Sequence, residues 1–149
     1  MEPYWLNQDI ADVQAVNTFE ELADLALRII RRMPQPVAQV CGPITSGGLG
    51  SVEKNLERFQ KTIDLLRDRG ESIFNQMLFE QPMFRIKATP YYQGGDQLLH
   101  KFYLPIFESG LVKILYFMSD WQSSYGAKWE HEQALRLGIK IRYLSSGGD

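Results

Sequence analysis

The feature that most constrains the fold is an alternation of short apolar runs with helical patterns in the second half of the chain. Residues 112–118 read VKILYFM, and residues 139–144 read IKIRYL. Both runs have the length and the β-branched and aromatic content of buried strands. Between them, residues 127–137 follow a helical period. Ser123 and Ser124 offer N-cap oxygens for this helix, Gly126 allows a tight turn after the strand, and Gly138 is positioned as a C-cap. This order predicts two parallel strands joined by a crossover helix.

The first half of the chain shows the same alternation. Val37–Cys41 is a short apolar run bounded by proline and glycine, and the glycine-rich segment Gly42–Gly50 follows it. Ser51 then opens an amphipathic helix over 52–69, and a second strand is expected over 71–78. The whole pattern predicts an α/β fold in which helices pack on a mostly parallel sheet.

The remaining segments predict additions around this sheet. Residues 1–17 contain aromatic side chains but no clear period, which indicates an arm, whereas Thr18 and Glu21 form a capping-box pattern before a helix over 19–33. Residues 80–97 suggest a long irregular loop with room for a short strand at 83–88, and a helix is expected over 96–107. We therefore expect an N-terminal arm and helix over 1–36, packed on an α/β domain over 37–149.

Composition excludes several classes of partner. The net charge is −2 without a basic block, so nucleic acid and anionic membranes are not expected partners, and no apolar run reaches membrane length. The single Cys41 rules out an internal disulfide and a cysteine-rich zinc site, which suits a reducing cytoplasm. The isolated His100 and His131, without clustered acids, give no metal-site signal, so no metal is expected.

Glu130 occupies an unusual position. At 100° per residue it lies between Ala134 and Leu137, on the helical stripe that should face the sheet, whereas Glu132 should point to solvent. One reading is that Glu130 is a first-turn acid that complements the helix dipole. The other is that it is a catalytic carboxylate, kept ionised by the dipole, at the carboxyl edge of the strands where open α/β sheets bind ligands. Spacing leaves both open.

The segment Gly42–Gly50 reads GPITSGGLG. Its glycines, together with Thr45, Ser46 and the following helix N-terminus, fit a cradle for phosphate or hydroxyl groups. The same composition also fits a mobile connection. The segment lacks both the Walker ending and the GxGxxG fingerprint of dinucleotide-binding loops.

One motif adds a resemblance to a known family. Ser124, Gly126, Ala127, Glu130 and Ala134 form the pattern SxGAxxExxxA, and Trp121 precedes it. This pattern resembles the C-terminal signature of the nucleoside 2-deoxyribosyltransferase-like superfamily, in particular a short uncharacterised branch that carries a tryptophan before the serine. In enzymes of that family the glutamate is the nucleophile that attacks the anomeric carbon. The resemblance implies the same role for Glu130, with Trp121, Ser124 and Gly126 in the substrate site.

The resemblance covers about residues 37–143. The family's first strand ends in a loop that receives the sugar and any 5′-phosphate, which implies binding roles for Gly42, Pro43, Thr45 and Ser46. Asn75 stands at the family's Asn-Pro position, although Gln76 replaces the proline. The implied fold is a three-layer α/β/α sandwich of flavodoxin-like type, with a mostly parallel sheet of about five strands.

The chain departs from the family at one catalytic position. Many members carry an aspartate at the start of the strand assigned here to 112–118, but Lys113 stands at that place. The nearest acid is Asp120, at the other end of the strand. Asp120 either replaces the missing group as general acid or is a loop residue that caps the turn at 121–124, and the sequence leaves both readings open.

The resemblance implies an N-glycosidic bond enzyme that acts on a nucleoside or nucleotide without a cofactor. Two alternatives remain, a non-catalytic module that binds a nucleotide or ribosyl ligand, and a purely structural or partner-binding domain. Because the family's enzymes are usually homo-oligomers, a homodimer or larger assembly is expected. The aromatic candidates for its interface are Tyr4, Trp5, Tyr91, Tyr92 and Phe102, of which Tyr91 and Tyr92 are also candidates for stacking on a base.

Overall fold

The computed structural model describes residues 2–90, 92, 94 and 96–145. The chain divides into two compact units. Unit 1 consists of Met1–Pro34 and Leu78–Leu111, and its described elements are helical. Unit 2 consists of Gln35–Met77 and Val112–Asp149 and contains the sheet. The predicted packing of residues 1–36 on the domain over 37–149 stays a prediction.

Unit 2 is built on a parallel sheet. Its strands are β1 (Val37–Cys41), β2 (Ser72–Ile73), β3 (Val112–Phe117) and β4 (Lys140–Tyr143), in the order β2-β1-β3-β4. Every neighbouring pair is parallel. The predicted α/β fold with a parallel sheet is therefore confirmed, with four strands in the described residues where about five were expected.

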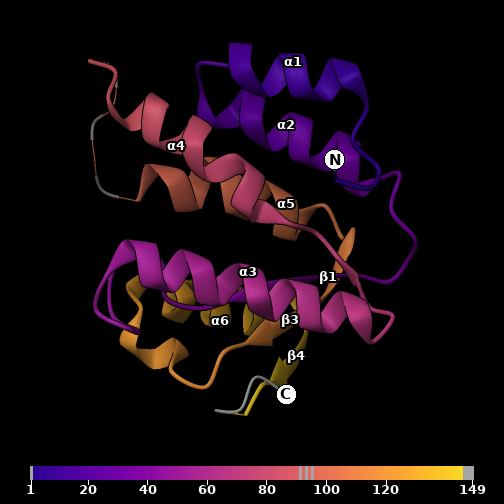
Figure 1. The fold of residues 1–149 in the computed structure, drawn as a ribbon, viewed down its shortest axis with the longest axis vertical. Coiled ribbons are helices and arrows are strands. Elements are labelled where there is room, and N and C mark those ends of the chain that lie inside the picture. The colour runs from indigo at the N-terminus through magenta and orange to yellow at the C-terminus, as the bar shows by residue number, and fades with distance from the viewer. Residues whose placement is uncertain (1, 91, 93, 95, 146–149) are drawn as a thin grey trace. The chain divides into compact units, whose positions relative to one another are not determined.

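Two helices cover opposite faces of the central strand β1 (Figure 1). Ala38 and Val40 belong to the core that they share with Phe59 and Ile63 of α3 (Val52–Asp68). The alternate residue Gln39 contacts Glu130 of α6 (Tyr125–Leu137). Because successive side chains of a strand point to opposite faces, α3 and α6 form the two outer layers of a three-layer arrangement.

The predicted helix caps of unit 2 are confirmed. The hydroxyl of Ser51 accepts a hydrogen bond from the amide of Lys54 at 3.2 Å, which begins α3. Ser124 accepts from Ala127 at 3.2 Å and begins α6. Gly138 ends α6 in the left-handed conformation with φ of 71°, where glycine carries no steric cost.

The second strand is much shorter than the predicted span of 71–78. The oxygen of Asn75 accepts from the amide of Met77 at 3.0 Å, and this turn leads into a 3₁₀ helix, η1 (Gln76–Phe79). The side chain of Gln76 then donates to the carbonyl of Val40 at 2.7 Å. A side-chain amide thus replaces the backbone donor that a longer β2 would have offered to β1.

Unit 1 corrects two predictions. Its described helices are α1 (Asn7–Ala15), α2 (Phe19–Ile30), α4 (Glu80–Lys87), a π-helical turn η2 (Leu99–Tyr103) and α5 (Leu104–Glu108). The predicted arm over 1–17 contains α1, and the predicted strand at 83–88 lies mainly in α4. The helix expected over 96–107 is confirmed, and it passes Pro105 because Leu104 donates to Leu99, five residues back. This wider turn accommodates a residue that has no N–H to donate.

Two proposed interface aromatics lie inside unit 1. Trp5 packs against Phe79 with ring centroids 5.5 Å apart, and Phe79 packs against the fully buried Phe102 at 5.4 Å. Because core packing uses these rings, Trp5 and Phe102 are withdrawn as interface candidates. Tyr92 packs edge-on against Phe19, Tyr4 is exposed, and Tyr91 lies outside the described residues. In the part of the chain that the structure describes, no helix is long and apolar enough to cross a membrane.

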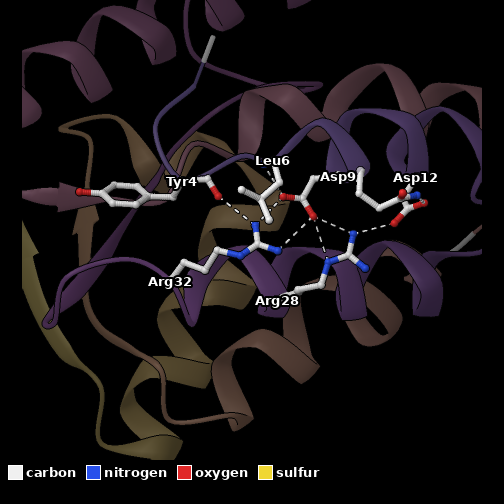
Figure 2. A network of polar contacts seen from close by, with 7 residues as sticks. Tyr4, Leu6, Asp9, Asp12, Arg28 and Arg32 are labelled. Carbon is white, nitrogen blue, oxygen red and sulfur yellow. Dashed lines mark hydrogen bonds and ion pairs between the residues drawn. The ribbon is translucent and has the colours of Figure 1, made fainter.

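A buried carboxylate joins α1 to α2 (Figure 2). Asp9 has no exposed surface and accepts hydrogen bonds from Arg28, Arg32 and the amide of Leu6. Arg32 also donates to the carbonyl of Tyr4 at 3.0 Å. Burial alone would raise the pKa of Asp9, but the hydrogen bonds from Arg32, Leu6 and Arg28 outweigh it and lower the pKa to about 2.

We expect Asp9→Asn to destabilise the protein by about 1.5–3 kcal/mol, the usual contribution of hydrogen bonds to a charged group. Urea unfolding followed by circular dichroism measures this. Glu57→Gln is the control because it removes only an exposed pair with Lys61, and such pairs contribute at most about 1 kcal/mol. Since the pKa of Asp9 is lowered, its contribution should be lost as the pH falls below 4 towards 2. Equal effects of the two substitutions would contradict this account.

Candidate active site at the carboxyl edge of the sheet

The carboxyl ends of β1 and β3 lie next to each other and lead into the two predicted site loops. Cys41 pairs with Phe117, and the next residue, Met118, donates to the carbonyl of Cys41 at 3.0 Å. Gly42 then passes directly beside Met118, where an added Cβ would lie 2.5 Å from the sulfur. A side chain at this first loop position would therefore force the Met118 side chain to move.

The two loops are hydrogen-bonded to each other. The amide of Gly48 donates to the hydroxyl of Ser123 at 2.9 Å, and this hydroxyl donates to the carbonyl of Asp120 at 2.7 Å. Gly47 has φ of 71°, and an added Cβ would lie 2.1 Å from the carbonyl oxygen of Ser123. The glycine-rich loop thus reaches the turn before α6 only because Gly47 has no side chain.

Asn55 of α3 holds the glycine-rich loop from within. Its oxygen accepts from the amide of Leu49 at 2.9 Å, and its nitrogen donates to the carbonyls of Ile44 at 3.0 Å and Gly47 at 3.2 Å. The side chain is almost completely buried. In the sequence, Asn55 and Phe59 match an N-x-x-x-F pair of the family branch that the chain resembles, but this match assigned Asn55 no role in the site.

A pocket of about 490 Å³ lies between this loop and the first turn of α3. Its lining residues are Thr45, Ser46, Gly47, Gly48, Gly50, Ser51, Val52 and Asn55. The predicted residues Thr45 and Ser46 therefore line a pocket, whereas Gly42 and Pro43 are buried beneath the loop. The amides at a helix N-terminus have no helical acceptor, so this pocket offers donors suited to an anion or to hydroxyl groups.

Glu130 faces β1, as its helical period predicts. It is 7% exposed, and its carboxyl oxygen Oε2 accepts from the amide of Gln39 at 3.4 Å. The thiol of Cys41 also hydrogen-bonds to it. Within the described ranges, no lysine, arginine or histidine forms an ion pair with Glu130. It is not one of the residues that line the pocket.

The expectation that the helix dipole keeps Glu130 ionised is wrong. Burial raises the pKa of Glu130 to about 8, although the hydrogen bond from Cys41 acts in the opposite direction. The physical reason is its place in the helix. Since α6 begins at Tyr125, Glu130 lies in the second turn, beyond the unpaired amides that generate the positive end of the dipole. At neutral pH the side chain is therefore mainly protonated.

Gln39 carries one unpaired polar atom beside Glu130. Within the described residues, Oε1 of Gln39 is buried without a hydrogen-bond partner, while its Nε2 donates to Glu130. Exchanging the two ends of the amide would let a protonated Glu130 donate to Oε1, but it would leave Nε2 unpaired instead. In either orientation one polar atom of Gln39 is buried without a partner.

Asp120 forms an ion pair instead of a cap. Both of its carboxylate oxygens accept from Arg58 of α3, at 2.9 and 3.1 Å. The turn η3 (Trp121–Ser123) is closed by the amide of Ser123 on the backbone carbonyl of Asp120 at 3.0 Å, so the predicted side-chain cap is absent. Asp120 thus ties its loop to α3, and its role as general acid stays a prediction.

Trp121 begins a cluster of aromatic rings on the other side of the same turn. It stacks on His131 with ring centroids 4.2 Å apart and planes inclined by 16°. The ring nitrogen Nε2 of His131 lies 2.7 Å from the hydroxyl of Tyr143 in β4. Sequence analysis identified Trp121 and gave His131 no role in the site. It did not identify Tyr143, which lies 22 residues after Trp121 in the chain.

Ser124, Gly126 and Asn75 have local structural roles, and their predicted roles in binding stay predictions. Ser124 is buried and caps α6, and Gly126 lies within the first turn of α6 instead of in a tight turn after the strand. Asn75 is buried and forms the turn after β2. Lys113 is exposed at the amino end of β3, the end opposite to the site loops. Among the described residues, no group of three or more histidine, cysteine, aspartate or glutamate side chains is placed to hold a metal ion.

Comparisons of this chain with protein-family models, with curated proteins and with solved structures found no match. The resemblance to the deoxyribosyltransferase-like superfamily therefore rests on the motif residues.

The raised pKa of Glu130 predicts a specific pH dependence of stability. The folded protein holds a proton that the unfolded chain releases above about pH 4.5, so Glu130 should lower the free energy of unfolding progressively as the pH rises towards 8. Glu130→Gln removes this effect, since glutamine keeps the shape without ionising. We expect the variant to gain stability relative to wild type between pH 5.5 and pH 8.5, by up to about 1.4 kcal/mol for each pH unit below the folded pKa of about 8.

Urea unfolding of both proteins at the two pH values measures this difference. The matched control is Glu132→Gln, because Glu132 is exposed on the same helix. A stability difference between Glu130→Gln and wild type that does not change with pH would show that Glu130 is ionised in the folded protein.

Proposed function

We propose that this chain cleaves or transfers the N-glycosidic bond of a nucleotide or a related ribosyl compound, with Glu130 as the nucleophile. The observation that carries this proposal is the burial of the Glu130 carboxyl group without a cationic partner, beside Cys41 where β1 enters its loop. Such a group costs stability that an apolar side chain would not. A strongly perturbed carboxyl group beside a ligand-type loop is a good candidate for a functional residue.

The substrate would be held by the glycine-rich loop. Its pocket combines the hydroxyls of Thr45 and Ser46 with the first turn of α3. Backbone amides in such a turn favour the oxygens of a phosphate or of a sugar. Asn55 would keep the glycine-rich loop in one conformation, because its side chain forms hydrogen bonds with Ile44, Gly47 and Leu49 of that loop.

The reaction would follow the logic of retaining glycosidases. Glu130 first loses its proton, and its carboxylate attacks C1′ as the bond from C1′ to the base nitrogen breaks. The electron pair of that bond leaves with the base, which takes up a proton. Water or a second base then attacks C1′ of the glycosyl ester and restores Glu130, with net retention at C1′.

A non-catalytic module that binds the same ligands is the second candidate. The observation that favours it is the ion pair between Asp120 and Arg58. Departure of the base is assisted by a proton donor, and the acid nearest to the predicted position is engaged with a guanidinium group. In this alternative the pocket would hold a nucleotide or ribosyl ligand, and Glu130 would remain protonated.

We expect Glu130→Gln to reduce turnover by roughly 10³-fold or more, because an amide cannot form the glycosyl ester. Release or exchange of the base from a panel of nucleosides and nucleoside monophosphates, followed by liquid chromatography, measures this. Glu132→Gln should keep wild-type turnover. Because the nucleophile must lose its proton, wild-type turnover should rise with pH and level off above about pH 8.

The outcomes separate the two candidates. Full turnover by Glu130→Gln would show that Glu130 is not the nucleophile. A ligand that raises the melting temperature of the wild type without being turned over would favour the binding module, since a ligand that binds only the folded state stabilises it.

A further inference from the structure

We infer that Trp121, His131 and Tyr143 form a stacking surface for a planar aromatic base, so that the ligand is a nucleotide and not a sugar phosphate alone. We call these three residues the aromatic shelf. This inference rests on the proposed function, because it concerns the base end of a ligand whose phosphate or sugar occupies the glycine-rich loop.

The rings of the shelf are ordered relative to one another. Trp121 and Tyr143 are nearly parallel, with planes inclined by 29° and centroids 6.3 Å apart. His131 stacks directly on Trp121 and lies 2.7 Å from the Tyr143 hydroxyl through Nε2. These contacts fix the rings before any ligand arrives, which reduces the entropy lost on binding.

The aromatic shelf packs against the buried Phe117 on one side and is open to solvent on the other. Phe117 of β3 has no exposed surface, and its ring lies 5.4 Å from Trp121 and 5.0 Å from His131. Tyr143 is 61% exposed, and Trp121 and His131 are partly exposed. Rings that are held in place on one side and accessible on the other suit the stacking of a ligand.

One short turn connects the shelf to the loop pocket. Trp121 and Ser123 are the first and last residues of η3. Trp121 contributes its ring to the shelf, and the Ser123 hydroxyl accepts from Gly48 of the glycine-rich loop. A nucleotide has the same division, since its phosphate and its base lie on either side of the sugar.

The chemistry of the shelf specifies a class of ligand. Aromatic side chains stack on every nucleobase, because each base presents a π face, and the affinity gain is roughly 5- to 150-fold per base. His131 and Tyr143 add polar atoms that suit the edge of a base. Tyr92, an earlier candidate for this role, packs on Phe19 in unit 1.

The test compares two probes that share a phosphate and a sugar, AMP and ribose 5-phosphate. Isothermal titration calorimetry on the full chain should show that the wild type binds AMP at least about 5-fold more tightly. Trp121→Ala and Tyr143→Ala should remove this preference and leave the affinity for ribose 5-phosphate unchanged. Trp121→Phe should restore part of it, because phenylalanine keeps a π face.

Phe84→Ala is the matched control, since Phe84 is an aromatic residue of α4 in unit 1 and 76% exposed. It should keep the preference for AMP. Equal affinity of the wild type for AMP and ribose 5-phosphate would overturn the shelf and leave the proposed function standing. Failure of both probes to bind would contradict the proposed function, and the shelf with it.

Discussion

Both faces of β1 are buried, but one face is packed against apolar side chains of α3 and the other against a carboxyl group of α6. Ala38 and Val40 are apolar and complete a core with α3. Gln39 and Cys41 turn polar atoms toward α6, and α6 meets them with the carboxyl group of Glu130. Burial of that group keeps it protonated, because a charge there would have neither water nor a cation. Glu130 is therefore neutral in the resting protein, and it must lose its proton before it can act as a nucleophile.

Elements defined by local signals could be predicted from the sequence. The bounds of β1 follow from an apolar run between proline and glycine, and the capped ends of α2, α3 and α6 follow from side chains near in sequence. Elements that depend on distant partners could not be predicted. The helix α1 is joined to α2 through Asp9, whose partners Arg28 and Arg32 lie about 20 residues away. The strand β2 stops early because Asn75 forms a turn that a strand pattern does not reveal.

The same division applies to the candidate site. The face of Glu130 follows from the helical period, and Thr45 and Ser46 follow from the composition of their loop. The protonation of Glu130 depends on its surroundings in three dimensions, which a sequence pattern does not give. The ion pair of Asp120 with Arg58 and the contact of Tyr143 with His131 join different elements, so no spacing rule indicates them.

The most direct test of this account is the titration of the Glu130 side chain by nuclear magnetic resonance. Carboxyl carbons labelled with ¹³C report the ionisation of each glutamate, and the spectrum of Glu130→Gln assigns the signal. The account predicts a midpoint near pH 8 for Glu130, far above the ordinary value of 4.5. A midpoint near 4.5 would mean that the carboxyl group is solvated or ion-paired, and it would contradict the account.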